Sequence, residues 1–568
     1  MEQKKIRITG AQLSFPVGAI QQNKETILNT IEIAESVESD IVIFPELCLT
    51  GYPPEDLLLR ESFLGKNYSV LEEIAEFSSE SSAIIGFVDR TKDVNKTDLK
   101  SRGIANAAAI VQNGDVKGIY HKCFLPNYSV FDEARYFSKG NDPGKLFWYE
   151  NIAVGISICE DIWINDGPAS LQVKNGASLI ININASPFDI NKSTNRKNLV
   201  VEQAKLLGVP IIYLNTVGGQ DELVFDGGSF IVNKNGEIIH QSNQFQEEIF
   251  HIELELDVKN ESKNTNLKIR EKTLNLNTTK NYKELSKNEE VYTALKLGLR
   301  DYVKKNKFKK VLIGLSGGID SALTATIAVD ALGSENVTCV AMPTKFNSPD
   351  SLIDASSLAT NLGIELKVIE IEELVEKYRE ILTKQFNEKI ISVTDENIQS
   401  RIRGNLLMAL SNQTGAMVVS TGNKSEMAVG YSTLYGDLAG GFALLKDVYK
   451  TEVYNLSNYR NSISKVIPQN SISKEPSAEL RPNQLDKDSL PDYELLDKIL
   501  NLYIEEDSSS EKIISEGIDE EIVYGVLEKV DRNEYKRKQV APGVKLTEKA
   551  FGKDRRMPIT NTYIRDRG

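Results

Sequence analysis

The stretch "VLIGLSGGIDSAL", residues 311–323, decides the fold of the second half of this chain. Its first five residues are apolar and predict a buried strand, the two glycines that follow predict a tight turn, and residues 321–332 predict a helix. Glycines let backbone N–H groups approach a pyrophosphate closely, and the start of a helix adds a favourable dipole. No lysine follows in the position of a GxxxxGK[ST] loop, so this is not a loop for γ-phosphoryl transfer.

Outward from this stretch, strands and helices alternate. Further strands are predicted at "VTCVAMPT" (337–344), "ELKVIEI" (365–371) and "AMVVST" (416–421), and an amphipathic helix is predicted at the start of this half, with apolar residues at 292, 295, 299 and 302. This alternation predicts an α/β domain with a doubly wound parallel sheet at residues 291–568. Residues 257–290 are polar and predict a linker along the surface.

The first half, residues 1–256, also alternates strands with helices. Runs such as "DIVIFPE" (40–46), "IAVGISICED" (152–161) and "ASLIININAS" (177–186) are apolar almost throughout, which favours strands buried on both faces. Asn-Gly pairs at 113–114 and 235–236, each between strand-like flanks, predict hairpins. The chain is therefore expected to hold two α/β domains.

Composition excludes several classes of protein. The 568 residues carry 67 Lys plus Arg against 81 Asp plus Glu, a net charge of −14, which argues against general binding to nucleic acid or an anionic membrane. No apolar run approaches the ~18 residues that span a bilayer, and no signal peptide is visible. The four cysteines form no CxxC pair, so neither disulfides nor a cysteine-rich zinc site is expected, and a cytoplasmic location fits.

Three residues in the first half follow predicted strands and together suggest a nucleophilic centre: Glu46, Lys122 and Cys159. Each alone fits a buried thiol or a charge at a strand end. The acids beside Cys159 would raise its pKa, so a reactive thiol needs a cation and a base from elsewhere. Only three histidines occur, and none stands in a Cys-His hydrolase motif. Lys122 can favour the thiolate and stabilise an oxyanion, and Glu46 can act as the base.

These residues, in "IVIFPELCLTGYPPEDL", "YHKCFLPNYSVFDEARYF" and "SICEDIW", resemble the Glu-Lys-Cys triad of the nitrilase/amidase family. The resemblance implies an αββα sandwich that hydrolyses C–N bonds. "NASPFDINKSTNR" (184–196) and "NTVGGQDELVFDGGS" (215–229) are similar to the branch whose amide is L-glutamine. This branch usually has glycine where the chain has Asn191, which also tolerates left-handed backbone angles. The implied glutamine pocket is lined by Tyr128, Glu160, Ser186 and Lys192.

In the second half, the SGGxDS turn resembles the pyrophosphatase loop of ATP-dependent ligases with an adenine nucleotide alpha-hydrolase-like Rossmann fold. Residues 400–453, "KEPSAELRPNQLDKDSLPDYELLD" (474–497) and "EYKRKQVAPGVKLTEKAFGKDRRMPI" (534–559) are similar to the NAD synthetase family. The resemblance implies a ligase that amidates deamido-NAD through an acyl-adenylate, with ammonia from glutamine reaching the ligase site by a protected passage. It also implies a homo-oligomer with paired synthetase domains.

Family motifs imply a role for individual residues of the second half. Asp320 and Glu426 would hold Mg²⁺, because hard carboxylate oxygens suit that ion. Without the resemblance, Asp437 fits a turn equally well and Lys536 fits a solvated helix face. The implied ATP contacts are Gly314, Leu315, Ser316, Gly317, Gly318, Ile319, Asp320, Ser321, Thr421 and Lys450. The implied deamido-NAD contacts are Asn397, Glu426, Asp437 and Lys536.

Other functions fit the sequence less well. GMP and asparagine synthetases share the ATP loop, but their glutaminase halves use a Cys-His-Glu set or an N-terminal cysteine, and residue 2 here is glutamate. A tRNA-thiolating enzyme would need a thiol carrier, and Cys339 is the sole cysteine beyond Cys159. A non-enzymatic scaffold would not need both motif sets. Residues 464–493 predict a lid that orders over bound substrates, with a fixed surface crossover as the alternative.

Overall fold

A computed structural model describes residues 3–91, 103–258, 267–276 and 282–563 of the chain. Contacts divide the chain into two units. The first comprises residues 1–220 and 224–284, and the second comprises residues 221–223 and 285–568.

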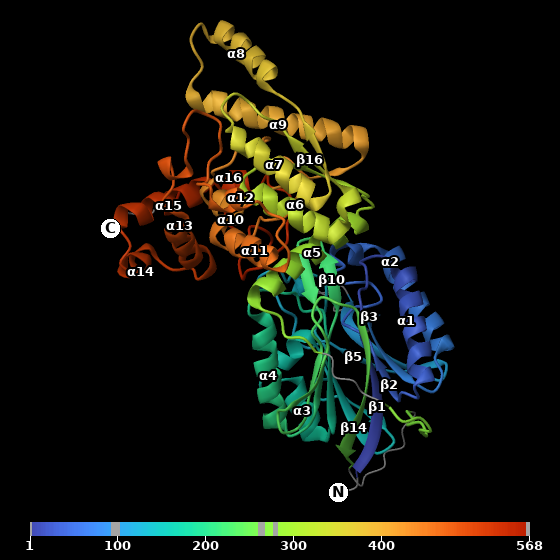
Figure 1. The fold of residues 1–568 in the computed structure, drawn as a ribbon. Helices are drawn as coiled ribbons and strands as arrows, with labels where there is room; N and C mark the ends of the chain where they lie inside the picture. The colour runs from blue at the N-terminus through green and yellow to red at the C-terminus, as the bar shows by residue number, and fades with distance from the viewer. Residues whose placement is uncertain (1–2, 92–102, 259–266, 277–281, 564–568) are drawn as a thin grey trace. The chain divides into compact units, whose positions relative to one another are not determined.

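The first unit contains two six-stranded sheets (Figure 1). One has the order β14-β1-β2-β3-β4-β5, with strands β1 (Gln3–Gln12), β2 (Ile41–Ile43), β3 (Ser82–Arg90), β4 (Ile104–Gln112), β5 (Asp115–His121) and β14 (Glu248–Asp257). The other has the order β13-β12-β9-β8-β7-β6, with strands β6 (Leu146–Tyr149), β7 (Ile152–Ile158), β8 (Leu179–Asn184), β9 (Ile211–Asn215), β12 (Phe230–Val232) and β13 (Ile238–Gln241). A separate hairpin pairs β10 (Val217–Gln220) with β11 (Leu223–Asp226).

Helices cover the outer face of each sheet. α1 (Ile20–Ser36) and α2 (Glu61–Phe77) share a buried apolar cluster with the first sheet, and α3 (Pro168–Asn175) and α4 (Lys192–Leu207) share another with the second sheet. A third cluster joins the inner faces of the two sheets. The helices therefore enclose the sheets in an αββα sandwich, as predicted (Figure 1).

Both Asn-Gly pairs lie in hairpins. Asn113 and Gly114 have φ of 50° and 79° between β4 and β5, the left-handed angles of a type I′ turn. Gly236, between β12 and β13, has φ of 81°. The chain meets these angles with the two residue types that tolerate them best, and both predictions are confirmed.

Strand β14 was not predicted. It pairs antiparallel with β1 along its whole length, from Gln3 opposite Asp257 to Gln12 opposite Glu248. From Phe250 onward its sequence "EIFHIELELD" alternates apolar and polar residues because one face of the strand packs in the core, whereas the prediction relied on continuous apolar runs.

The expected linker at 257–290 lies partly outside the described residues. Within it, Leu267 is buried in the core of the first unit and bridges to Tyr149. The Arg270 backbone N–H donates to Asp40 Oδ1 at 2.9 Å, and its guanidinium contacts Glu35. The described stretch 267–276 is thus attached to the sandwich.

The second unit contains a five-stranded sheet whose neighbouring strands all run parallel. Its order is β17-β16-β15-β18-β19, with strands β15 (Val311–Gly314), β16 (Val337–Ala341), β17 (Glu365–Val368), β18 (Met417–Ser420) and β19 (Phe442–Ala443). The first four were predicted, and the two-residue β19 is too short for a periodic signal.

Helices flank this sheet on both faces. α8 (Glu372–Phe386) and α9 (Ser392–Thr414) bury apolar residues against one face, while α6 (Ile319–Leu332) and α7 (Pro349–Leu362) contact each other on the other face. α5 (Lys287–Lys305) and α11 (Lys450–Ile463) pack on α6. The doubly wound arrangement is confirmed. The C-terminal part has its own apolar cluster and contains α10 (Lys424–Val429), α12 (Gln469–Ser473), α13 (Tyr493–Leu500), α14 (Ser510–Ser515), α15 (Glu520–Arg532) and α16 (Glu534–Arg537).

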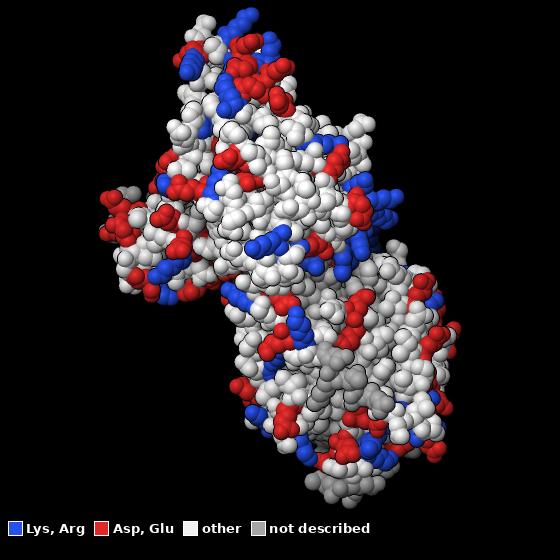
Figure 2. Space-filling view, in the orientation of Figure 1, with Lys and Arg blue, Asp and Glu red and all other residues white. Residues whose placement is uncertain are grey.

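Two features bear on partners. Among the described residues, no helix is long and apolar enough to cross a membrane. Acidic and basic side chains lie side by side over both units on the face drawn in Figure 2.

Candidate active sites

The three candidate catalytic residues of the first unit lie at strand ends and are buried. Glu46 follows β2, Lys122 follows β5, and Cys159 follows β7, with exposed fractions of 2%, 0% and 5%. Lys122 Nζ donates to Glu46 Oε1 at 2.7 Å. The structure therefore brings together residues that are 76 positions apart in the sequence.

Cys159 stands at a sharp change of backbone direction. It begins the 3₁₀ turn η3 (Cys159–Trp163) directly after β7, and its φ is 43°. A non-glycine residue at positive φ carries backbone strain and persists only where the surroundings hold it.

The charges around the thiol oppose each other. Burial, together with the Glu46 carboxylate, raises the pKa of Cys159 well above its ordinary value, while the Lys122 ammonium lowers it. Burial would lower the pKa of Lys122, but the carboxylates of Glu133 and Glu46 raise it well above its ordinary value, so the cation persists at neutral pH. Glu46 can take the thiol proton and Lys122 can stabilise the resulting anion.

Glu133 is a buried member of this cluster that the sequence did not assign. Its Oε1 accepts from Lys122 Nζ at 2.8 Å and from the Tyr52 hydroxyl at 2.9 Å. Burial raises its pKa to about 7, against the lowering effect of Lys122. It lies eleven residues after Lys122 in "HKCFLPNYSVFDEARYF", and nothing in that pattern distinguishes it from Asp132 before it.

Glu46 is held from both sides. Asn106 Nδ2 donates to Oε1 at 2.7 Å and the backbone N–H of Ala185 donates to Oε2 at 2.9 Å. Asn106 lies on β4, and Ala185 follows β8 of the other sheet. The base is thus oriented by fixed donors from both sheets.

The four candidate glutamine-binding residues lie on segments that follow β5, β7 and β8. The Tyr128 hydroxyl donates to Glu160 at 3.0 Å, and Tyr128 is about half exposed. Ser186 is buried, and its backbone N–H donates to Asn215 Oδ1 at 2.9 Å.

Lys192, the fourth candidate, begins α4. Its Nζ lies 3.4 Å from Asp189 Oδ2 and over the ring of Trp163. Asn191, just before it, has φ of 77°, the left-handed angle that explains why asparagine can replace glycine there.

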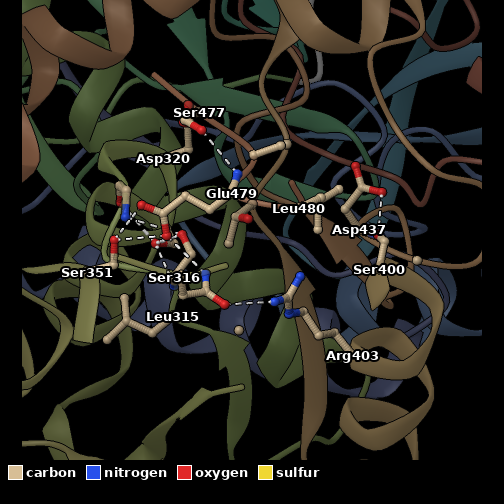
Figure 3. A pocket seen from close by; sticks show the side chains of 18 of the residues that line it. Leu315, Ser316, Asp320, Ser351, Ser400, Arg403, Asp437, Ser477, Glu479 and Leu480 are labelled. Carbon is tan, nitrogen blue, oxygen red and sulfur yellow. Dashed lines mark hydrogen bonds between the residues drawn. The ribbon is translucent and has the colours of Figure 1, made fainter. Parts of the chain in front are cut away.

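In the second unit, the SGGID turn lines a cavity of about 620 Å³ (Figure 3). Every predicted loop residue from 314 to 321 lines the cavity except Gly317. Gly317 has φ of 85°, and a Cβ there would lie 2.2 Å from the Ser351 carbonyl oxygen on α7. Its role is therefore close packing of the turn against α7, which only glycine permits.

Asp320, Glu426 and Lys450 meet in this cavity. Lys450 Nζ lies 2.5 Å from Asp320 Oδ2 and 3.4 Å from Glu426 Oε1, so one cation already contacts both carboxylates. Asn423 Nδ2 donates to Asp320 Oδ1 at 2.8 Å. Burial raises the pKa of Glu426 to about 8, against the lowering effect of Lys450.

This donor set fits Mg²⁺. Among the described residues, no group of three His, Cys, Asp or Glu side chains could hold a metal ion by itself. Mg²⁺ is commonly held by one or two carboxylates together with substrate phosphates and water. The pair of Asp320 and Glu426 has that form.

The remaining predicted residues of this half, including Thr421, also line the cavity. Asp437 Oδ1 accepts from the Thr433 N–H at 2.7 Å and from the Ser400 hydroxyl at 3.1 Å (Figure 3). Thr433 in turn donates to Asn397 Oδ1 at 2.8 Å. Lys536 Nζ donates to two backbone carbonyl oxygens on residues 430 and 432, so its ammonium is held at the cavity wall.

The segment at 464–493 also lines the cavity, through residues 471–486. Lys474 Nζ donates to Ser351 Oγ at 2.6 Å and to Glu479, and Glu479 accepts from Asn347 Nδ2 at 3.0 Å (Figure 3). These bonds attach the segment to α7, through Ser351, and to the residues just before α7, through Asn347. On α9, burial lowers the pKa of Arg403 to about 10, and its guanidinium donates to Asn347.

Known protein families and individual relatives of this chain agree with this geometry. Residues 7–263 match the carbon-nitrogen hydrolase family, and residues 291–540 match the NAD synthase family. The glutamine-dependent NAD(+) synthetase of Thermotoga maritima is 46% identical, and the match covers 99% of each chain. That of Aquifex aeolicus is also 46% identical, and the match covers 99% of this chain and 100% of the other. The solved structure of the glutamine-dependent NAD+ synthetase from Acinetobacter baumannii in complex with adenosine diphosphate is 40% identical, covers 99% of both chains and has a TM-score of 0.75.

Fold and sites thus define a chain that joins a carbon-nitrogen hydrolase unit to an NAD synthase unit. At this level of identity over the full length, the chain belongs to the family of glutamine-dependent NAD(+) synthetases.

Proposed function

We propose that this chain is a glutamine-dependent NAD(+) synthetase that converts deamido-NAD to NAD with ATP, releasing AMP and diphosphate. The observation that carries the proposal is that one chain holds two complementary centres. One is the buried contact of Lys122 with Glu46 beside Cys159, and the other is the cavity lined by the SGGID turn.

The first centre would supply ammonia from glutamine. Glu46 takes the thiol proton as Cys159 Sγ attacks the side-chain amide carbon, and Lys122 stabilises the oxyanion. The C–N bond breaks, the proton leaves with ammonia, and a thioester remains. Water, activated by Glu46, then releases glutamate and restores the thiol. Tyr128, Glu160, Ser186 and Lys192 offer the charges and hydroxyls that the ammonium and carboxylate of glutamine require.

The second centre would activate the nicotinate carboxylate. A carboxylate oxygen attacks the α-phosphorus of ATP, diphosphate leaves, and an acyl-adenylate forms. This activation is needed because AMP is a better leaving group from the acyl carbon than oxide. Ammonia then attacks the acyl carbon and AMP departs. Thr421 and the turn from Gly314 to Ser321 would hold ATP, and Lys450 would face its phosphates. Asn397, Glu426, Asp437 and Lys536 would hold deamido-NAD.

Mg²⁺ would be held by Asp320 and Glu426. When bound, it supplies positive charge that neutralises the departing diphosphate. The chain's own part is to orient these carboxylates, which Asn423 does for Asp320.

Other properties of the proposed enzyme follow from the family and the charge balance. We propose a homo-oligomer that pairs its synthetase units, and a cytoplasmic enzyme whose partners are small molecules and not nucleic acid. The division into a glutaminase domain at 1–256, a linker at 257–290 and a synthetase domain at 291–568 is part of the same proposal.

The test measures AMP release and NAD formation with glutamine, deamido-NAD and ATP added together or one left out. One AMP should form per NAD, and formation should stop without deamido-NAD. Ammonium salt should replace glutamine. AMP release that is independent of deamido-NAD would refute the proposal, and so would a failure to form NAD with every nitrogen source.

A further inference from the structure

We propose that Asp161 is a positioning residue that fixes the Cys159 turn against the Lys122 segment through one buried carboxylate. The inference rests on the proposed glutaminase function, because it assigns a role within that centre. Asp161 has no exposed surface and is the third residue of the turn that Cys159 begins.

The Asp161 carboxylate accepts four hydrogen bonds from two segments. Oδ1 accepts the backbone N–H of Cys123 at 3.1 Å and that of Phe124 at 2.9 Å, the two residues after Lys122. Oδ2 accepts the N–H of Ile158, which precedes Cys159, at 3.1 Å and the hydroxyl of Tyr120 at 2.9 Å. Oδ1 thus binds the chain around the lysine alone, whereas Oδ2 joins that chain, through Tyr120, to the chain around the nucleophile, through Ile158.

These two segments belong to different sheets. Lys122 follows β5, an edge strand of the first sheet, and Cys159 follows β7 of the second. The inner faces of the two sheets share an apolar cluster, and apolar packing is non-directional. Hydrogen bonds are directional, so the carboxylate can set how far the thiol lies from the ammonium.

The chemistry of the four donors requires a carboxylate. An ionised carboxylate accepts only, whereas an amide offers one accepting oxygen and one NH₂ donor. In Asp161→Asn, the oxygen can keep the N–H groups of Cys123 and Phe124, but the NH₂ group then faces the N–H of Ile158. The substitution is close to isosteric and releases the turn on the nucleophile's side. Burial raises the pKa of Asp161 to about 6, against the lowering effect of the N–H groups of Ile158 and Phe124 and of the Tyr120 hydroxyl.

The experiment compares Asp161→Asn with Asp40→Asn in the full chain. Asp40 is a matched control because it too is buried and accepts backbone N–H groups, from Arg7 at 2.7 Å and from Arg270 at 2.9 Å. It precedes β2, at the other end of this strand from Glu46. Asp161→Asn should lower kcat for glutamine hydrolysis by about 100-fold, the scale of a displacement of about 1 Å in a reacting group. Asp40→Asn should leave it within twofold, and ammonium-dependent NAD formation should persist in both.

A second readout separates positioning from charge. The apparent pKa of Cys159 is measured from the pH dependence of its alkylation by iodoacetamide, followed by mass spectrometry of the peptide. The thiol faces Glu46, Lys122, Glu133 and Glu160. Removal of a negative charge at Asp161 would by itself lower this pKa. A thiol displaced from the Lys122 ammonium loses the stabilisation of its thiolate, which raises the pKa of Cys159. We expect this pKa to rise in Asp161→Asn.

Three results decide the proposal. A raised Cys159 pKa with reduced kcat supports it. A lowered or unchanged pKa overturns it, as does a kcat within threefold of the parent while stability falls as in Asp40→Asn. If Asp161→Asn does not fold, Tyr120→Phe, which removes one of the four donors, should still raise the Cys159 pKa. Failure of the parent chain to hydrolyse glutamine would overturn the proposed function, whereas the alkylation comparison would still test Asp161.

Discussion

Lys122→Ala should impair both the stability and the chemistry of the first unit. The substitution removes the cation that contacts Glu46 at 2.7 Å and Glu133 at 2.8 Å, and both carboxylates are at most 5% exposed. Breaking a buried ion pair by removing one partner costs about 3–5 kcal/mol, because the remaining charge is buried without compensation. Glutamine hydrolysis should fall about 100-fold or more, the scale of losing an oxyanion donor.

The loss of stability should depend on pH. In the parent, burial raises the pKa of Glu133 from 4.5 to about 7, although Lys122 lowers it. The folded chain then binds a proton more tightly than the unfolded chain between these values, so its free energy of unfolding decreases as pH rises through this window, by about 3 kcal/mol in all. Without Lys122 the pKa of Glu133 should rise further. The deficit of the variant should therefore be small near pH 5 and largest near pH 8.

Urea unfolding followed by tryptophan fluorescence measures this deficit in the right part of the chain, since both tryptophans, Trp148 and Trp163, lie in the first unit. Lys272→Ala is the matched control: its Nζ lies 2.8 Å from buried Asp40. The control should lose stability but keep glutamine hydrolysis. The reasoning is refuted if Lys122→Ala hydrolyses glutamine within threefold of the parent, or if its deficit does not grow between pH 6 and 8.

Three further predictions concern the division of labour between the centres. Cys159→Ala should abolish glutamine-dependent NAD formation and keep the ammonium-dependent reaction; loss of both in a folded variant would contradict the proposed role of the thiol. Asp320→Asn should lower NAD formation with either nitrogen source by about 100-fold or more and shift the Mg²⁺ requirement upward, with glutamine hydrolysis intact; an unchanged Mg²⁺ titration would rule it out as a ligand. Amide hydrogen exchange in residues 464–493 should slow when ATP and deamido-NAD are added, and equal protection with and without them would favour a fixed crossover.

Much of the fold was predictable because its strongest signals are local. Buried strands such as β7 and β8 are continuous apolar runs, and the turn at residues 315–318 carries its own glycines. The edge strand β14 escaped because half of its side chains face away from the core, and β19 because two residues carry no period. Both segments form strands because they pair with strands that are distant in the sequence, and a short stretch of sequence does not contain that information.

The residues of the candidate sites also fall into those that local sequence identified and those that it did not. The thiol, the lysine, the glutamate and the glycine turn were candidates from the sequence because each follows a predicted strand and stands in a motif that resembles a known family. Glu133 and Asp161 were not, although both lie in quoted motifs, because their importance comes from partners on other strands. The role of a buried acid can be inferred only when its hydrogen-bond donors are known. Asp161 has four donors. Glu133 accepts from Lys122, the lysine that also contacts Glu46. The sandwich creates these relations when it brings β5, the edge strand of one sheet, against β7, an interior strand of the other. A chain with the same three catalytic residues but no acceptor at position 161 would keep the thiol and the ammonium but would no longer hold them at a fixed distance. We therefore expect the reactivity of Cys159 to depend on Asp161, although Asp161 does not contact the substrate in this proposal.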